Sequence, residues 1–460
     1  MKINLKTYWN LHRVSILLTL LSLIFYGVFA YDLNRSDSIK LLSLTGALTL
    51  LYVKLLQFEK FNFTYLAAVG VLFRLVFWCA TPNLSPDYFR FIWDGQLLLH
   101  GTNPYLFTPD QLMDEAGSLF PLAERLYSGM TDLSAQHYSN YPPINQYFFA
   151  LAAALGGSTL IANLIALRAI TLLADVGILL VGRQLLLQFN KSPHLIFWYF
   201  LNPMIIIELT GNLHFEGVMI LFFMIGFLML NTQRLFLGAL FFSLSIGTKL
   251  VPLLFLPLLL PRLGLLRSAF FYLSLLACLI VGGFPLFTTD VLPNYLNTLG
   301  LWFSNFEFNA GFYNLSQQLA NYLEIPSWRF IRQYGALTPW ITAGSALLLS
   351  LHPKMRQSRY WFNGALGALT VYYALAAVLH PWYLAFPLLL CLFTRWRFPL
   401  WWSVLVLVSY TAYGTSEVQE KTIWLLIEYI TVFGVLGYEL YNLRGYIRIN
   451  SKKFGNQTVK

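Results

Sequence analysis

Residues 15–30 read SILLTLLSLIFYGVFA, a run without a single charged side chain. Similar runs recur along a chain that is 57% hydrophobic and only 11% charged. Lipid offers no partner to an open backbone group, so a spanning segment must be a helix or a strand of a closed barrel. A barrel strand alternates apolar and polar residues, and these runs do not. The sequence therefore predicts an all-α polytopic membrane protein with a bundle of roughly 12–14 transmembrane helices, each about 20 residues long.

The predicted spans leave one large polar gap near the start of the chain. Three spans are expected near 14–31, 41–57 and 63–79, and residues 80–143 then form a polar loop with amphipathic interfacial helices. Residues 144–157 are too short to span and are expected to form an interfacial or re-entrant helix. Further spans are expected near 159–187, 193–208, 216–231, 234–247, 250–260, 268–286, 335–351, 360–378, 382–394, 398–414 and 422–441.

The distribution of basic residues predicts the orientation. The net charge is +10, and Lys and Arg gather at the N-terminus, in alternate short loops and at the C-terminus. Cytoplasmic loops of membrane proteins carry this excess, so both termini are expected in the cytoplasm, with the loops at 80–143 and 287–333 outside. We expect one integral domain over residues 1–460 in a bacterial plasma membrane, in contact with membrane lipids. No basic patch of the kind that binds nucleic acid is present.

The polar loop opens with DYFRFIWDGQLLLHGTNPY at residues 87–105. Asp87 and Asp94 are seven residues apart, two turns of a helix, and share a face with Arg90. The aromatic side chains of Tyr88 and Trp93 suit sugar stacking or a membrane interface. A carboxylate held where water is limited can act as a general base. The alternative is a solvated interfacial helix whose acids have no chemical role.

ELTGNLHFEGV at residues 208–218 places Asn212, His214 and Glu216 at the predicted outer end of two spans. Ionisable groups beside a membrane are costly to bury, so they are candidates for function. Two possible ligands, His214 and Glu216, make a weak metal signal. A polar cap that satisfies the helix ends explains the same residues equally well.

Lys249 and His380 are candidates for binding a phosphate. Lys249 stands in apolar sequence at a break between two short segments, where it would either pair with an anion or extend to the interface. His380 begins HPWYLAFPLLL and could bond a phosphate or a sugar hydroxyl, or cap the helix that follows. Trp382 and Tyr383 beside it suit the interface.

Other polar and aromatic residues complete the candidate site. NFEFNAGFYNL at residues 305–315 adds Glu307 and Asn309, a composition compatible with sugar binding. The full set of expected sugar or acceptor contacts is Tyr88, Trp93, Asn103, Tyr105, Tyr141, Gln146, Asn212, His214, Glu216, Glu307, Asn309, Trp382 and Tyr383. The three cysteines are scattered and give no metal spacing. No cofactor is indicated, and a divalent metal is possible without a paired acidic motif to support it.

The chain resembles the integral-membrane glycosyltransferases of the GT-C superfamily. Within that superfamily it is most similar to the polyprenyl-phosphate-mannose-dependent mannosyltransferases, including GPI mannosyltransferase I and bacterial relatives. The resemblance runs over about residues 80–260 and again near 380. It rests on an acidic first large loop followed by GTNPY and YPP, on WYFLNP before GNLHFEG, and on GTKLVPLLFLP.

The resemblance implies a polyprenyl-phosphate sugar donor, an extracytoplasmic site and a glycan or lipid-linked acceptor. It also implies an inverting hexosyl transfer, with mannose the expected sugar, in which a loop aspartate assists the acceptor hydroxyl. Asp87 best matches that aspartate, while Lys249, with His380 or Arg90, would stabilise the leaving phosphate. The family's paired acidic motif would need an acid near Ser85, which is absent, and this leaves Asp94 as a rival base.

Two other classes of protein remain as alternatives. A transporter or flippase of a lipid-linked substrate would use buried charges as a relay, but it would be expected to show paired broken helices in two similar halves. An O-antigen ligase or polymerase would place its large loop toward the C-terminal half, which fits poorly with the early polar loop of this chain.

Overall fold

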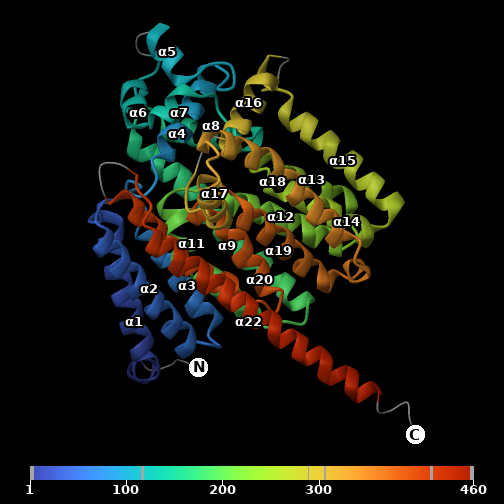
Figure 1. Cartoon of the computed structure of the whole chain (residues 1–460). Helices are drawn as coiled ribbons and strands as arrows, with labels where there is room; N and C mark the ends of the chain where they lie inside the picture. The colour runs from blue at the N-terminus through green and yellow to red at the C-terminus, as the bar shows by residue number, and fades with distance from the viewer. Residues whose placement is uncertain (1–4, 116–118, 288–289, 305–306, 415–417, 456–460) are drawn as a thin grey trace.

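A computed structural model describes residues 5–115, 119–287, 290–304, 307–414 and 418–455 (Figure 1). Regular structure within these ranges is helical. The one extended contact among them is an isolated parallel bridge between Phe308 and Val378. The prediction of an all-α polytopic membrane protein is confirmed.

Two helices, α1 (Leu5–Tyr31) and α2 (Ser38–Phe58), match the first two predicted spans, whereas α3 (Phe63–Leu75) covers only the first part of the third, which was expected near 63–79. Their starts follow ordinary capping chemistry, in which a side-chain oxygen accepts from a free backbone N–H of the first turn. Asp37 accepts from the N–H of Lys40 ahead of α2, and Asn62 accepts from that of Tyr65 ahead of α3.

Five short helices follow α3 and form the polar loop region. They are α4 (Asp87–Leu99), α5 (Pro109–Glu115), α6 (Ala123–Gly129), α7 (Asp132–Gln136) and α8 (Pro143–Gly156). In Figure 1 they lie at the end of the molecule opposite to the start of α1 and the end of α22. α4 lies directly on α8, because Gly95 has no side chain: a Cβ there would lie 2.3 Å from the carbonyl oxygen of Phe149.

The middle of the chain forms a bundle with several broken helices. α9 is long and unbroken. The segments at 193–211 and 235–263 are instead divided into short helical pieces, with prolines and polar residues at the breaks. The elements are α9 (Leu160–Gln188), η1 (Pro193–Ile196), α10 (Phe197–Phe200), α11 (Pro203–Ile205), the π-helical η2 (Ile206–Gly211), α12 (Glu216–Asn231), α13 (Leu235–Thr248), η3 (Val251–Phe255), α14 (Leu256–Leu263) and α15 (Leu265–Gly283).

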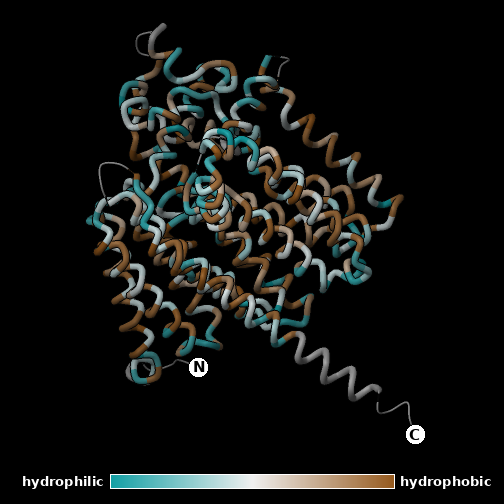
Figure 2. Tube along the Cα trace, in the orientation of Figure 1, coloured by the Kyte–Doolittle hydropathy of each residue, from teal (hydrophilic) through white to brown (hydrophobic). Residues whose placement is uncertain are grey.

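The C-terminal part continues the same architecture. Its elements are α16 (Val291–Ser304), α17 (Gly311–Tyr322), α18 (Ser327–Ser350), η4 (Pro353–Arg356), α19 (Ser358–Leu375), η5 (Pro381–Leu384), α20 (Ala385–Leu392), α21 (Phe398–Leu405), η6 (Val406–Tyr413) and α22 (Thr422–Gly455). Figure 2 shows hydrophobic residues along most of α15, and hydrophilic residues mainly in the connections at both ends of the bundle.

Five helices in the described ranges are long and apolar enough to cross a membrane. They are found at Thr7–Tyr31, Ser38–Phe58, Leu160–Gln188, Leu265–Gly283 and Thr422–Leu443. A sixth span is possible if Pro193–Phe200 and Pro203–Gly211, which meet at a bend of 56°, are counted as one. A total of 12–14 would also require the shorter apolar helices to cross, so that count stays a prediction.

Two buried arginines hold the helices that carry the polar residues. The Nε of Arg74 in α3 donates to Asp175 of α9 at 2.7 Å, and both side chains are fully buried. Arg168, also in α9, donates to the carbonyls of Trp78 and Ala80 after α3. It donates as well to the carbonyls at the end of η2, at Thr210 and Gly211. One side chain therefore fixes both the segment before Asp87 and the segment before Asn212.

Candidate active site

Asp87 is the first residue of α4 and is half-buried. The N-terminus of a helix carries a partial positive charge that favours a carboxylate. The hydroxyl of Ser85, where the paired acidic motif would need an acid, accepts from the backbone N–H of Asp87 at 3.3 Å. None of the ion pairs among the described residues involves Asp87. Its carboxylate is therefore free to accept a proton from another molecule.

The surroundings of Asp87 raise its affinity for a proton. Burial raises the pKa of the carboxyl group, and the Lys249 ammonium acts in the opposite direction. The Glu216 carboxylate adds to the increase, while the Arg35 guanidinium opposes it. A carboxylate with a raised pKa is a better general base near neutral pH than an ordinary aspartate.

Lys249 lies in the break between α13 and η3, near enough to Asp87 for its charge to act on that carboxyl group. Its Nζ is 2.8 Å from Oε1 of Glu216, at the start of α12, and 5.9 Å from the centroid of the Tyr141 ring. Lys249 is thus paired with a carboxylate of the chain itself, and its binding of a phosphate stays a prediction. The second oxygen of Glu216 is buried without a hydrogen-bond partner, so the pair keeps unused capacity for a further polar group.

The residues ahead of α12 form a connected polar group. Oε2 of Glu208 accepts from the hydroxyl of Tyr410 at 3.0 Å and from the amide of Asn212 at 3.2 Å. Asn212 in turn accepts from the backbone N–H of Leu84, in the segment that leads to Asp87, at 3.4 Å. His214 Nε2 is 3.7 Å from the same oxygen of Glu208. These side chains therefore bond to one another and to the segment before Asp87, and the start of α12 has no side-chain cap, so neither sequence interpretation of Asn212 and His214 is decided.

Trp382 is enclosed between two histidines. Its ring lies 3.5 Å from that of His214 and 4.3 Å from that of His380, with both pairs stacked. Tyr383 meets the His380 ring edge-on at 5.5 Å. Because both faces of Trp382 are covered, a sugar cannot stack on it, and its ring instead fixes the two histidines.

His380 does not carry the positive charge that a residue binding a phosphate by ion pairing would supply. Burial lowers the pKa of His380 to about 3, and the Lys249 ammonium and the Arg35 guanidinium act in the same direction. The imidazole is therefore neutral at physiological pH. It can donate one hydrogen bond to a phosphate or a sugar hydroxyl, but it does not supply positive charge.

Two residues that the sequence analysis did not predict, Arg35 and Tyr413, adjoin the polar cluster. We use this name for Asp87, His214, Glu216, Lys249 and His380. Arg35 lies in the turn between α1 and α2, and its guanidinium carbon is 3.3 Å from the centroid of the Tyr413 ring at the end of η6. The available signal was topological, because Arg35 is a basic residue in a short connection that the predicted orientation, which stays a prediction, would place outside. Tyr413 had no distinguishing signal in an aromatic-rich chain.

Asp94 occupies a very different environment from Asp87. It is fully buried, and its Oδ1 accepts from Nε of Arg90 at 2.6 Å. Its Oδ2 accepts from the hydroxyl of Ser139 at 2.5 Å and from the amide of Gln146 at 2.9 Å. Arg90 also donates to the carbonyls of the segment around α7, at Ser134 and His137. This group holds α4, α7 and α8 together, and the role of Arg90 in binding a phosphate stays a prediction.

Four more of the expected sugar contacts support the loop region. Tyr88 is buried beneath Phe89, and Trp93 is fully buried 5.2 Å from the Phe120 ring. Asn103 donates to the carbonyl of Leu286 after α15. The fourth, Tyr105, donates to the carbonyl of Tyr141 at 2.5 Å and thereby fixes the turn before α8. The structure therefore places these four side chains in packing and leaves Tyr141 facing Lys249.

Glu307 and Asn309 lie apart from the Asp87–Lys249 pair. Glu307 is exposed and accepts from Tyr313 and Gln317 of α17. Asn309 is buried, and its amide donates to Glu428 of α22 at 3.2 Å. The residue between them, Phe308, is the one that reaches the cluster, with its ring 5.0 Å from that of His380.

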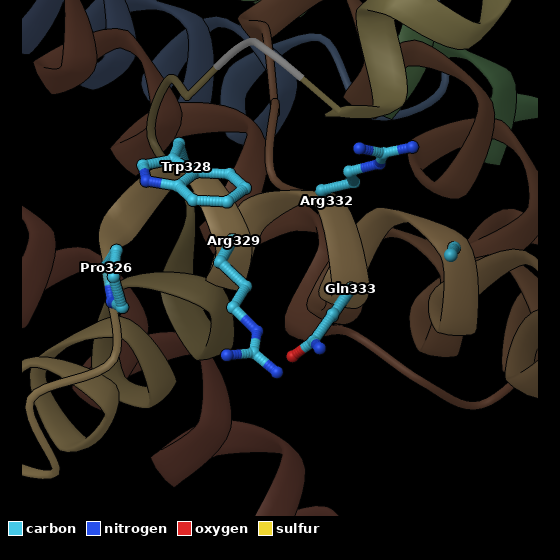
Figure 3. Close-up of a pocket in the computed structure, with 6 residues that line it drawn as sticks. Pro326, Trp328, Arg329, Arg332 and Gln333 are labelled. Atoms are coloured by element: carbon cyan, nitrogen blue, oxygen red, sulfur yellow. The ribbon is translucent and has the colours of Figure 1, made fainter.

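Two hollows lie over the first half of α18. Figure 3 shows Trp328, Arg329, Arg332 and Gln333 around the first one. The second has a cavity volume of about 980 Å³, and Glu307 is one of its lining residues. Across the described part of the chain, no three His, Cys, Asp or Glu side chains gather in a group that could hold a metal ion.

The fold is a helical bundle with several candidate membrane spans, and polar and ionisable side chains gather around Lys249 and Glu216 within it. Residues 34–263 match the family described as alpha-(1->6)-mannopyranosyltransferase, N-terminal domain, and the chain belongs to that family. The matched region contains Arg35, Asp87, Glu216 and Lys249, and it ends before His380 and Tyr413. A comparison with curated proteins gave no significant match. The family favours a glycosyltransferase over the transporter and ligase alternatives, and the resemblance to GT-C mannosyltransferases is confirmed.

Proposed function

We propose that the protein transfers mannose from a polyprenyl-phosphate-linked donor to an extracytoplasmic glycan or lipid-linked acceptor, with inversion at the anomeric carbon. The observation that carries the proposal is the juxtaposition of Asp87, a carboxylate without an ion-pair partner, and the Lys249 ammonium. A base and a cation in one pocket fit a reaction that removes a proton at one end and releases a phosphate at the other.

In the proposed reaction, the Asp87 carboxylate takes the proton from the acceptor hydroxyl. The hydroxyl oxygen forms a bond to the anomeric carbon as the bond from that carbon to the phosphate oxygen breaks. The electron pair of the broken bond stays on the phosphate, which gains one negative charge near Lys249. The family description names an α-(1->6) linkage, which inversion would produce from a β-linked donor sugar. Phosphate is a good leaving group, so positioning and charge stabilisation supply most of the catalysis.

The other residues of the cluster have supporting roles in this proposal. Glu216 holds the Lys249 ammonium in the pocket, and Tyr141 offers an aromatic face beside it. Neutral His380 and His214, held by Trp382, can donate or accept hydrogen bonds with sugar hydroxyls. Asp94 and Arg90 position α4, which presents Asp87. We assign no step to a metal ion.

The proposal is tested by supplying membranes that contain the protein with radiolabelled polyprenyl-phosphate mannose and an oligomannoside acceptor. Transfer from this donor, with an α-linked product and with severe loss in Asp87→Asn, is the expected result. A matched reaction receives the nucleotide sugar under conditions in which no lipid-linked sugar can form. Transfer from the nucleotide sugar alone would overturn the donor assignment. Near-normal transfer by Asp87→Asn would overturn the role of Asp87.

A further inference from the structure

Arg35 forms no ion pair with an acidic residue of the described chain. Asp32 and Asp37 stand close to it in the sequence, yet Asp32 pairs with Lys40 at 2.6 Å and Asp37 caps α2. The guanidinium of Arg35 instead lies flat over the ring of Tyr413. Its Nε is buried without a hydrogen-bond partner. A buried guanidinium donor without an acceptor is costly, and an incoming anion would remove that cost.

A chain of aromatic contacts connects Arg35 to His380, which also lies within the influence of the Lys249 charge. The Tyr413 ring that supports it is 5.8 Å from Phe308, and Phe308 is 5.0 Å from His380. The charges of Arg35 and Lys249 both act on Asp87 and on His380. The two cations reach this position from distant parts of the chain, one from the first turn and the other from the break after α13.

The two cations differ in how far they are already neutralised. Lys249 is paired with Glu216, so an arriving anion must share it with a carboxylate. Arg35 has no such competitor. Stacking on an aromatic ring leaves the edge of the guanidinium plane open, and that edge matches two phosphate oxygens at once.

We propose that Arg35 is a second ligand of the donor phosphate, binding it together with Lys249; this inference rests on the proposed function. The ligand class is a lipid-linked phosphodiester before transfer and the corresponding phosphomonoester after it. The phosphate gains a negative charge when the bond to the sugar breaks, so a fixed guanidinium stabilises the leaving group more than the donor. Tyr413 is a positioning residue that holds the plane of the guanidinium.

The experiment compares Arg35→Ala and Arg35→Gln with wild-type protein, and uses Lys40→Ala as the matched control. Lys40 is a basic residue at the start of α2, and its partner is Asp32. Three quantities are measured: the KM for polyprenyl-phosphate mannose, the inhibition constant of polyprenyl phosphate without sugar, and the KM for the acceptor. Thermal unfolding in detergent confirms that each variant is folded.

Both Arg35 variants are expected to lose about 10- to 100-fold in kcat/KM for the donor, the range of one charge-assisted hydrogen bond. Inhibition by polyprenyl phosphate weakens by a similar factor, whereas the KM for the acceptor and the Lys40→Ala control stay close to wild type. Arg35→Lys, which restores the charge without the planar fork, is expected to recover only part of the loss. A purely structural role for Arg35 would not separate donor from acceptor in this way.

The inference is overturned if a folded Arg35→Gln variant keeps its donor kcat/KM and its inhibition by polyprenyl phosphate within twofold of wild type. If Arg35→Ala does not fold, Arg35→Gln decides, because its side chain keeps a planar polar group and more of the arginine's apolar stem than alanine does. Wild-type protein that does not use the lipid-linked donor at all would instead refute the proposed function. The two failures are therefore distinguishable.

Discussion

Asp87 and Asp94 belong to one helix and lie two turns apart, yet they have opposite environments. Both oxygens of Asp94 accept hydrogen bonds from side chains, and the residue is fully buried. Asp87 is half-buried, has no ion-pair partner and faces a lysine that is paired with another acid. The comparison teaches that spacing on a helix selects neither of them as the reactive group. The partners from other helices make that selection.

The largest expected effect falls on catalysis at Asp87. Asp87→Asn keeps the shape of the side chain and removes its ability to take a proton, so kcat should fall by about 10²- to 10⁴-fold. The thermal midpoint of unfolding should stay close to that of wild type, because no ion pair is broken. Turnover with labelled donor and differential scanning fluorimetry measure the two quantities. A variant that loses stability and activity together would remove the contrast with Asp94.

The reverse pattern is expected at Asp94. Asp94→Ala leaves the buried Arg90 uncompensated, which costs about 3–5 kcal/mol of folding stability. Replacing both partners, as Arg90→Met with Asp94→Leu, should recover a large part of the loss, since a matched apolar pair leaves no buried charge. Equilibrium unfolding in detergent of both proteins provides the check. If Asp94→Ala were as stable as wild type, the structural role would be wrong.

A smaller effect concerns the pH dependence of the reaction. Burial raises the pKa of Asp87 and Lys249 holds it down, so Lys249→Met should raise it further. A general base is active above its pKa, and its rate is lost as the pH falls through that value. The acidic limb of the kcat/KM profile should therefore move to higher pH in Lys249→Met. Lys40→Met, the control, should leave the limb in place, and an unshifted limb in Lys249→Met would show that Asp87 is not the group observed.

The smallest effect is expected at Glu307, an exposed residue that contacts neither Asp87 nor Asp94 and bonds to α17 instead. Glu307→Gln can still accept from Tyr313 and Gln317. An exposed substitution of this kind changes stability by about 0.5 kcal/mol or less. Donor kinetics should be unchanged within error. A large increase in the KM for the acceptor would instead extend the site toward the hollow beside α18.

The sequence predicted the helices well, because apolar runs and polar connections mark their ends directly. The spans expected at 41–57 and 159–187 correspond closely to α2 and α9. The segments expected at 193–208 and 382–394 are less regular, since the prolines and polar turns within them interrupt the helices. Single-sequence periodicity identifies an apolar segment, but it does not show whether the segment is straight.

The sequence predicted those site residues that are charged within apolar segments, but it did not predict which side chains they contact. Lys249 stood out as a charge in apolar sequence, and its partner Glu216 was itself a candidate. The saturation of Asp94 depends on Ser139 and Gln146, 45 and 52 residues away, and the sequence does not state which side chain they meet. Arg35 and Tyr413 come from opposite ends of the chain. Such pairings are set by the tertiary fold.

The π-helical segment at Ile206–Gly211 has a consequence for the length of the chain. A π-helical turn contains one residue more than an α-helical turn, and such turns are often found at functional sites. Glu208 sits in this turn and Asn212 directly follows it. Removing a single residue here would restore α-helical winding and rotate the preceding residues by about 100° relative to α12. The number of residues in this turn is therefore as much a requirement of the pocket as their identity.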